Sequence, residues 1–123
     1  MLFRAAFAVT FLCLPITTQA LEIKGAYGNA EGCKLLKTGL ADNDSLLLVT
    51  AEQITSYGTG CEIVQLLQSK NGNEAVAVGL CGYEGEDYPG VEHYVIRKTE
   101  SNPPALKIYQ SSGDLWGELP PCP

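Results

Sequence analysis

Residue types that perform chemistry in enzymes are scarce in this chain. It contains one histidine, His93, and it lacks the Gly-x-Ser-x-Gly and His-Glu-x-x-His motifs and any glycine-rich phosphate loop. Strand alternation places His93 on the same face as Val91 and Val95, with no nucleophile motif beside it, so a sheet-facing histidine with a structural hydrogen bond is the better interpretation. We therefore expect no catalytic residue, no cofactor and no enzymatic activity.

Basic residues are also few. Lysine and arginine total 8 against 14 aspartates and glutamates, and the formal net charge is −6. Nucleic acids and anionic lipid surfaces are bound by clusters of positive charge, so the composition argues against both. An acidic surface permits a cationic partner, and the candidate partner is a cationic envelope or extracellular protein. The alternative interpretation is that the acidity serves solubility alone.

No apolar run is long enough to span a bilayer, which takes about 20 residues. The run from Ala5 to Ile16 follows Arg4 and gives way to small and polar residues up to Ala20, the order typical of a secretory signal peptide. We predict that residues 1–20 are a signal peptide and that residues 21–123 form a single β-domain. We expect this domain in the periplasm or outside the cell, without stable membrane insertion.

Removal of the signal peptide takes away Cys13 and reduces five cysteines to four. An even number of cysteines in a short exported chain indicates disulfides. The spacings are wide and no Cys-x-x-Cys pair occurs, which does not suit zinc, so we expect no metal. The predicted disulfide cysteines are Cys33, Cys61, Cys81 and Cys122.

Short segments rich in branched apolar residues recur along residues 21–123, separated by Gly, Asn, Asp and Pro. We predict an all-β, mainly antiparallel fold: a small disulfide-stapled sheet or barrel of about six to seven strands. At most one short helix is expected, within residues 29–37. The predicted strands are 21–24, 45–50, 53–57, 62–68, 74–81, 91–98 and 105–110.

The dipeptide Asn71-Gly72 between two apolar strands indicates a hairpin. Asn-Gly favours a two-residue type I′ turn, because both residues tolerate positive φ. Counting outward from that turn, Ile63 faces Leu80 and residue 62 faces residue 81. Apolar side chains then share one face, which supports this register. They are Ile63, Leu67, Val76, Val78 and Leu80.

The same register bears on the disulfide pairing. Cys61 is one residue out of step with Cys81, so their side chains point to opposite faces and a bond between them is disfavoured. We favour Cys33–Cys61 together with Cys81–Cys122. The pairing Cys33–Cys81 with Cys61–Cys122 stays open, and a bulged turn would restore Cys61–Cys81.

The most distinctive surface segment is residues 82–90, which combines three carboxylates, two tyrosines and three glycines. Loops of this composition present acidic and aromatic contacts to cationic proteins. The alternative is a solvated connection between strands. The candidate binding-loop residues are Glu84, Glu86, Asp87 and Tyr88.

Cysteines, glycines and predicted strands are arranged along the chain in five parts: 25–28 with Cys33, 47–54, Cys61, 81–86 and 116–122. This arrangement resembles that of small exported bacterial four-cysteine β-domain proteins of unknown function, and the resemblance implies no catalytic residues. More loosely, the design is similar to periplasmic inhibitors of lysozymes and secreted proteases, which are small disulfide-bonded β-barrels.

We therefore expect a non-enzymatic binding or inhibitory module of the bacterial envelope. The expectation depends on a stapled scaffold, an acidic loop and the lack of nucleophile or metal motifs. Two alternatives stay open. One is a structural or stress-related envelope protein without a defined ligand, and the other is a small hydrolase that uses paired carboxylates.

Overall fold

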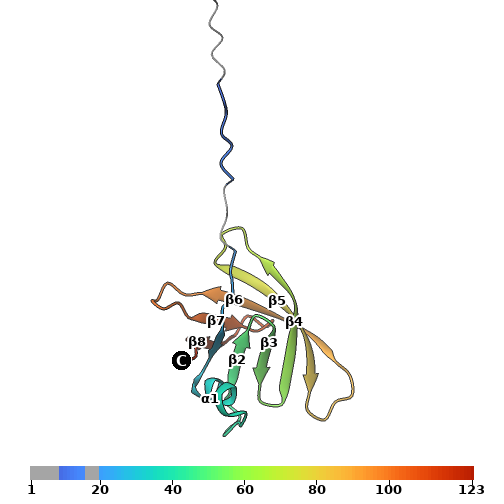
Figure 1. Cartoon of the computed structure of the whole chain (residues 1–123). Coiled ribbons are helices and arrows are strands. Elements are labelled where there is room, and N and C mark those ends of the chain that lie inside the picture. Colours follow the sequence, from blue (N-terminus) through green and yellow to red (C-terminus); the bar gives the residue numbers. More distant parts are fainter. Residues whose placement is uncertain (1–8, 16–19) are drawn as a thin grey trace, which may run out of the picture.

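The computed structural model describes residues 9–15 and 20–123. Most of the predicted signal peptide, residues 1–8 and 16–19, therefore lies outside the described residues. Each strand pairs antiparallel with its neighbour in sequence, which gives an up-and-down sheet (Figure 1). The elements are β1 (Ala26–Gly28), α1 (Ala30–Thr38), β2 (Leu47–Thr50), β3 (Gln53–Ser56), β4 (Thr59–Gln68), β5 (Glu74–Tyr83), β6 (Gly90–Lys98), β7 (Leu106–Tyr109) and β8 (Leu115–Leu119).

The sheet curls until its two edges meet. Just after β8, Pro121 forms a β-bridge to Tyr27 of β1. Beside it, the Gly28 N–H donates a 3.0 Å hydrogen bond to the Pro120 carbonyl. The fold is thus an all-β, nearly closed antiparallel barrel with one short helix, as the sequence predicts, and its described part has eight strands rather than six to seven.

The predicted and observed strands differ at both ends of the domain. Residues 21–24 form no strand; Leu21 and Ile23 are instead buried in the core. The Gln68 side-chain amide accepts from the Leu21 N–H at 2.8 Å and donates to the Leu21 carbonyl at 2.9 Å, which holds this segment in place. At the other end β8 was not predicted, because its apolar pattern is interrupted by Gly117.

Helix α1 packs beside the seam between β1 and the C-terminal tail. The Asn29 side chain caps its N-terminus by accepting the Gly32 N–H at 2.8 Å, as residues of this type commonly do. The same oxygen accepts the Leu47 N–H at 3.0 Å, which attaches the helix to β2. The Cys33–Cys122 disulfide then links the helix to the tail and reinforces the seam.

The disulfides of the structure join Cys33 to Cys122 and Cys61 to Cys81. The pairing favoured from the sequence, Cys33–Cys61 with Cys81–Cys122, is therefore wrong, as is Cys33–Cys81 with Cys61–Cys122. The four cysteines predicted to form disulfides do so, but the partners differ.

A β-bulge in β4 explains the error. Up to Gln65, which faces Val78, the hairpin follows the predicted register. The extra residue at Val64 then shifts the register, and a bulge of this kind leaves one residue of the strand unpaired. Cys61 consequently faces Cys81, with 3.9 Å between their Cα atoms, and the side chains point to the same face.

The turn itself also differs from the prediction. Gly72 has a φ of 74°, whereas no described residue other than glycine has a positive φ. Asn71 therefore does not adopt the conformation that a type I′ turn requires. Its side chain accepts the Asn73 N–H at 3.0 Å, and the Ser69 N–H bonds to the Glu74 carbonyl, so a longer loop closes the same register.

The barrel places the small residues of β5 inside and the branched ones outside. Ala75, Ala77 and Gly79 are buried, whereas Val76 and Leu80 are 36% and 41% exposed. The apolar face predicted for this hairpin is thus largely the outer face, and the bulge turns Ile63 to the inner one. Small inward residues leave room for large side chains from other strands in a narrow barrel.

The core fills the barrel with aliphatic side chains, the Cys61–Cys81 disulfide and one tyrosine. Its buried members are Leu21, Ile23, Leu47, Val49, Ile54, Cys61, Ala75, Ala77, Cys81, Tyr94, Ile96, Leu106, Ile108 and Leu119.

Candidate functional site

Three hairpin loops gather at one end of the barrel, which we call the mouth. They are the β3–β4 loop (57–58), the β5–β6 loop (84–89) and the β7–β8 loop (110–114). In an up-and-down barrel every second connection lies at the same end, because successive strands run in opposite directions. The longer β1–β2 connection, residues 29–46 with α1, therefore lies at this end as well. The β3–β4 and β5–β6 loops are joined by a 2.8 Å hydrogen bond from the Glu84 N–H to the Gly58 carbonyl.

A pocket of about 310 Å³ opens between these loops. Its walls come from β3, β4, β5, β6 and β8 and from the β7–β8 loop, and they combine hydroxyls, one carboxylate and three aromatic rings. This mouth pocket is lined by Ser56, Thr59, Tyr83, Glu92, Tyr94, Gln110, Ser111, Ser112 and Trp116. Barrel mouths are common positions for binding sites, because strand ends from the whole circumference converge there.

The carboxylate of the mouth pocket is held by a tyrosine. The Tyr83 hydroxyl donates a 2.7 Å hydrogen bond to Glu92 Oε1. This bond to a carboxylate raises the pKa of Tyr83 to about 12, since the bond is lost when the phenol ionises. Gly90 makes the arrangement fit, because a Cβ there would lie 2.8 Å from the Tyr83 ring. Among the described residues, none donates a hydrogen bond to the second carboxylate oxygen of Glu92, so this oxygen can accept from another donor.

An aromatic pair forms the inner wall of the same pocket. The Tyr94 and Trp116 rings are stacked, with centroids 5.5 Å apart and planes inclined by 16°. The Tyr94 hydroxyl lies 3.5 Å from the Sγ of Cys61, and burial of the ring raises the pKa of Tyr94. The disulfide that joins β4 to β5 therefore supports the floor of the pocket.

The predicted binding loop lies at the rim of the mouth rather than in the pocket. Glu84, Glu86, Asp87 and Tyr88 are all exposed, Tyr88 by 82%. The loop turns tightly at Gly85, whose φ is 80°, and its Glu86 N–H bonds to the Tyr83 carbonyl at 3.1 Å. The rim carboxylates thus follow directly after the tyrosine that holds Glu92.

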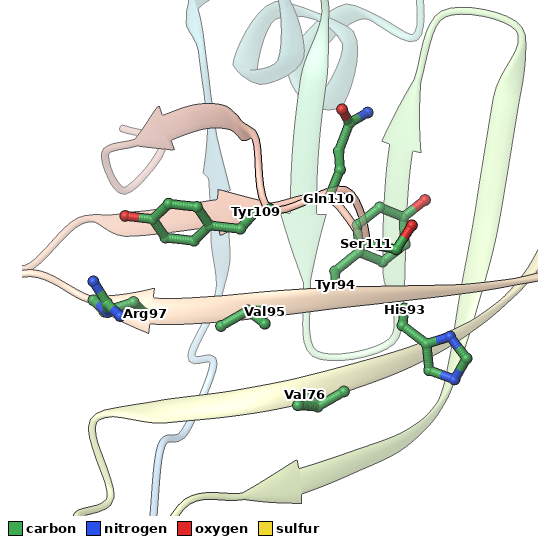
Figure 2. A pocket seen from close by; sticks show the side chains of 9 residues that line it. Val76, His93, Tyr94, Val95, Arg97, Tyr109, Gln110 and Ser111 are labelled. Carbon is green, nitrogen blue, oxygen red and sulfur yellow. The ribbon is translucent and has the colours of Figure 1, made fainter.

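A second cavity, of about 520 Å³, lies on the outer side of β6 and is called the outer groove here. Figure 2 shows its lining: Val76, Val95 and Tyr109 supply apolar surface, and His93 and Arg97 project from β6. Arg97 Nε forms a 2.8 Å ion pair with Glu74, and its guanidinium lies 5.4 Å from the centre of the Tyr109 ring.

His93 lies in this outer groove, on the same strand face as Val91 and Val95, as predicted. It is exposed, and its imidazole forms no hydrogen bond with any of the described residues, so the structural hydrogen bond expected for it is not formed. The histidine is a surface group beside an apolar groove.

Glu92 and Tyr94 were not predicted as site residues from the sequence. They alternate with Val91, His93 and Val95, so the pattern indicates only that one face of the strand is more polar. Their role depends on Tyr83, nine residues before Glu92 across the β5–β6 hairpin, and on Trp116 of the more distant β8. Alternation within 90–96 could have pointed to Glu92 as an inward carboxylate, but not to its partners.

Comparison of the chain with models of known protein families, with curated protein sequences and with solved structures finds no match. Within residues 9–15 and 20–123, no helix is long and apolar enough to cross a membrane. The same described residues contain no group of three or more His, Cys, Asp or Glu side chains arranged to hold a metal ion.

Proposed function

We propose that this chain is an exported, non-enzymatic binding or inhibitory module of the bacterial envelope that binds a cationic protein at the mouth of its barrel. The observation that carries the proposal is the composition of the mouth. Its three hairpin loops contain four carboxylates, those of Glu84, Glu86, Asp87 and Asp114, and no lysine or arginine. The β1–β2 connection at the same end adds three carboxylates and two lysines, Lys34 and Lys37, and Lys34 is paired with Asp42, so this end of the barrel stays acidic. A concentration of like charge at one end of a molecule steers and orients a partner of opposite charge.

Aromatic side chains at the mouth supply the apolar contacts that such an interface needs. Tyr57 and Tyr88 are 58% and 82% exposed on the two loops that the Glu84–Gly58 hydrogen bond joins. Tyrosine and tryptophan contribute large contact areas at low cost in conformational entropy, and they are frequent among residues that dominate binding energy. Inside the mouth pocket, the stacked rings of Tyr94 and Trp116 add further aromatic surface beside Glu92.

The scaffold supports the proposal through rigidity. The Cys61–Cys81 disulfide joins β4 and β5 three residues from the β3–β4 and β5–β6 loops, and the Cys33–Cys122 disulfide secures the seam. A site that is already in its binding conformation loses less entropy when the partner docks. A stapled barrel with a pre-formed mouth is therefore well suited to recognition.

The test uses residues 21–123 immobilised at low ionic strength and exposed to periplasmic extract and to two cationic hydrolases, egg-white lysozyme and trypsin. Changing Glu84 and Glu86 to Gln and Asp87 to Asn should weaken binding at least tenfold, with a strong dependence on salt. The matched control changes Glu52, Glu100 and Glu118 to Gln. These three are also exposed but lie outside the mouth loops, and the net charge changes equally.

The control variant should lose less than twofold in affinity. Equal losses in both variants would show that only net charge matters, and the mouth would then not be the site. Retention of neither hydrolase nor any periplasmic protein at low salt would remove the support for a cationic partner. Inhibition of either hydrolase's turnover would distinguish an inhibitor from a binding module.

A further inference from the structure

The wall of the barrel has a gap beside the mouth. Strand β6 pairs with β5 over residues 90–97, but with β7 only from Val95 to Lys98. Strand β7 ends at Tyr109, and the chain turns away through residues 110–113, where the Gly113 N–H bonds to the Gln110 carbonyl. Residues 90–94 of β6 are therefore a strand edge that is paired on one side only (Figure 2).

The backbone groups that face this gap can be identified. The Lys98 N–H donates to Asn73 before β5, and the next residue, Thr99, donates to Ala105 before β7. Successive residues of a strand direct their N–H and C=O groups to alternate sides. The backbone N–H and C=O groups of the odd-numbered residues of β6 therefore point toward β7, and in the unpaired segment these residues are Val91 and His93. No described residue pairs with their N–H or C=O groups on that side.

A cavity lies on each side of this edge. The mouth pocket is on the inner side and the outer groove is on the outer side, and both are lined in part by Tyr94, Gln110 and Ser111. An extended peptide directs alternate side chains to opposite faces of the sheet that it joins. The two cavities are therefore placed to receive neighbouring side chains of one added strand.

We infer that the edge at residues 90–94 of β6 binds an extended segment of the cationic partner as an additional antiparallel strand. This inference rests on the proposed function and specifies the partner's form. The segment exchanges hydrogen bonds with Val91 and His93. Its residue opposite Glu92 points inward, and an arginine or lysine there meets the Glu92 carboxylate and the aromatic wall. The two flanking residues point outward and are apolar, to suit Val95 and Tyr109.

The charges at this edge favour a partner segment over a second copy of the chain. Two copies paired antiparallel about Glu92 would bring their two Glu92 residues directly opposite each other. Like charges directly opposite across a strand pair are destabilising. A cationic side chain at that position is stabilising instead, because the carboxylate already accepts one hydrogen bond and has an oxygen to spare.

The probe is the blocked peptide acetyl-Thr-Val-Arg-Val-Thr-amide, which matches this pattern. Nuclear magnetic resonance of labelled residues 21–123 should show the largest shifts at the amides of Val91 and His93. Methylating the two valine nitrogens of the peptide removes its donors toward β6 and should weaken binding at least tenfold. Replacing its arginine by glutamate should weaken binding by a similar factor, because of Glu92.

A protein variant gives the matched test. His93→Pro removes the backbone N–H that faces the gap, whereas His93→Ala removes the imidazole as well but keeps that N–H. Proline is tolerated at a strand edge whose N–H faces solvent, so both variants should fold, which thermal unfolding checks. Peptide binding should fall at least fivefold further in H93P than in H93A.

Equal binding of the methylated and unmethylated peptides, or no shifts at these amides at millimolar peptide, would overturn the inference. A concentration-dependent dimer through the same amides, without peptide binding, would also overturn it, because the occupant would then be a second copy. If the cationic partner is still retained in the pull-down while H93P has no effect, the edge is not the site and the proposed function stands. If the wild-type chain retains no cationic partner in the pull-down, the proposed function itself is refuted.

Discussion

Removal of the Cys33–Cys122 disulfide provides a quantitative test of how the barrel is closed. The two cysteines are 89 residues apart in sequence, but Cys61–Cys81, with a separation of 20, shortens the path between them in the unfolded chain. For a loop of about 70 residues the chain-entropy relation gives about 4.4 kcal/mol at 25 °C. The variant C33A/C122A should therefore lose about 4 kcal/mol of unfolding free energy, a large share of the roughly 5–15 kcal/mol typical of a domain.

The assay is urea unfolding of residues 21–123, comparing free energies extrapolated to water. Midpoints alone would mislead, because an unfolded chain without the cross-link is more expanded and has a larger m-value. The seam should still close through the Tyr27–Pro121 bridge, so fluorescence of Trp116, the only tryptophan of the chain, should be unchanged in the folded state. A loss below about 1 kcal/mol would refute the reasoning that this disulfide acts by restricting the unfolded chain.

The second disulfide offers the contrasting case: C61A/C81A should cost about 3 kcal/mol from loop entropy, and it should also alter Trp116 fluorescence, because Cys61 supports the Tyr94 ring that stacks on the indole. Unchanged fluorescence would contradict that contact. Ultraviolet titration should reveal one tyrosine with a pKa of about 12, that of Tyr83, and Glu92→Gln should bring this pKa down toward 10. Since the folded pKa is raised, the stabilisation from this bond is complete below pH 10 and is lost as the pH rises through about 12; stability that is flat across this range would count against the bond. Truncation of the buried Ile108 to Ala should cost about 2–5 kcal/mol by urea unfolding, whereas Leu115→Ala, at a half-exposed position, should cost less than about 1 kcal/mol.

Much of the architecture could be predicted from the sequence because it depends on local patterns. Branched apolar segments separated by turn residues indicate an antiparallel β fold, and Asn29 followed by residues 30–37 indicates the one helix. The hairpin register was right as far as Gln65 because the turn and the apolar pattern act over a few residues. The bulge at Val64 has no local signal. It depends on which residues β5 must meet across the strand pair, and it alone restores the alignment of Cys61 with Cys81.

By itself the sequence determined the strand content, the four cysteines that form disulfides and the acidic, aromatic composition of residues 82–90. Composition and periodicity are properties of neighbouring residues, so they can be read along the chain. Only the tertiary structure decided the disulfide partners, which face of the central hairpin is buried, and the meeting of Glu92 with Tyr83, Tyr94 and Trp116. It also decided that residues 90–94 of β6 lack a neighbouring strand. The bulge in β4 aligns Cys61 with Cys81, and the curl of the sheet decides which hairpin face lies inside. Closure of the barrel brings Cys33 to Cys122 and leaves a gap where β7 is too short to cover β6.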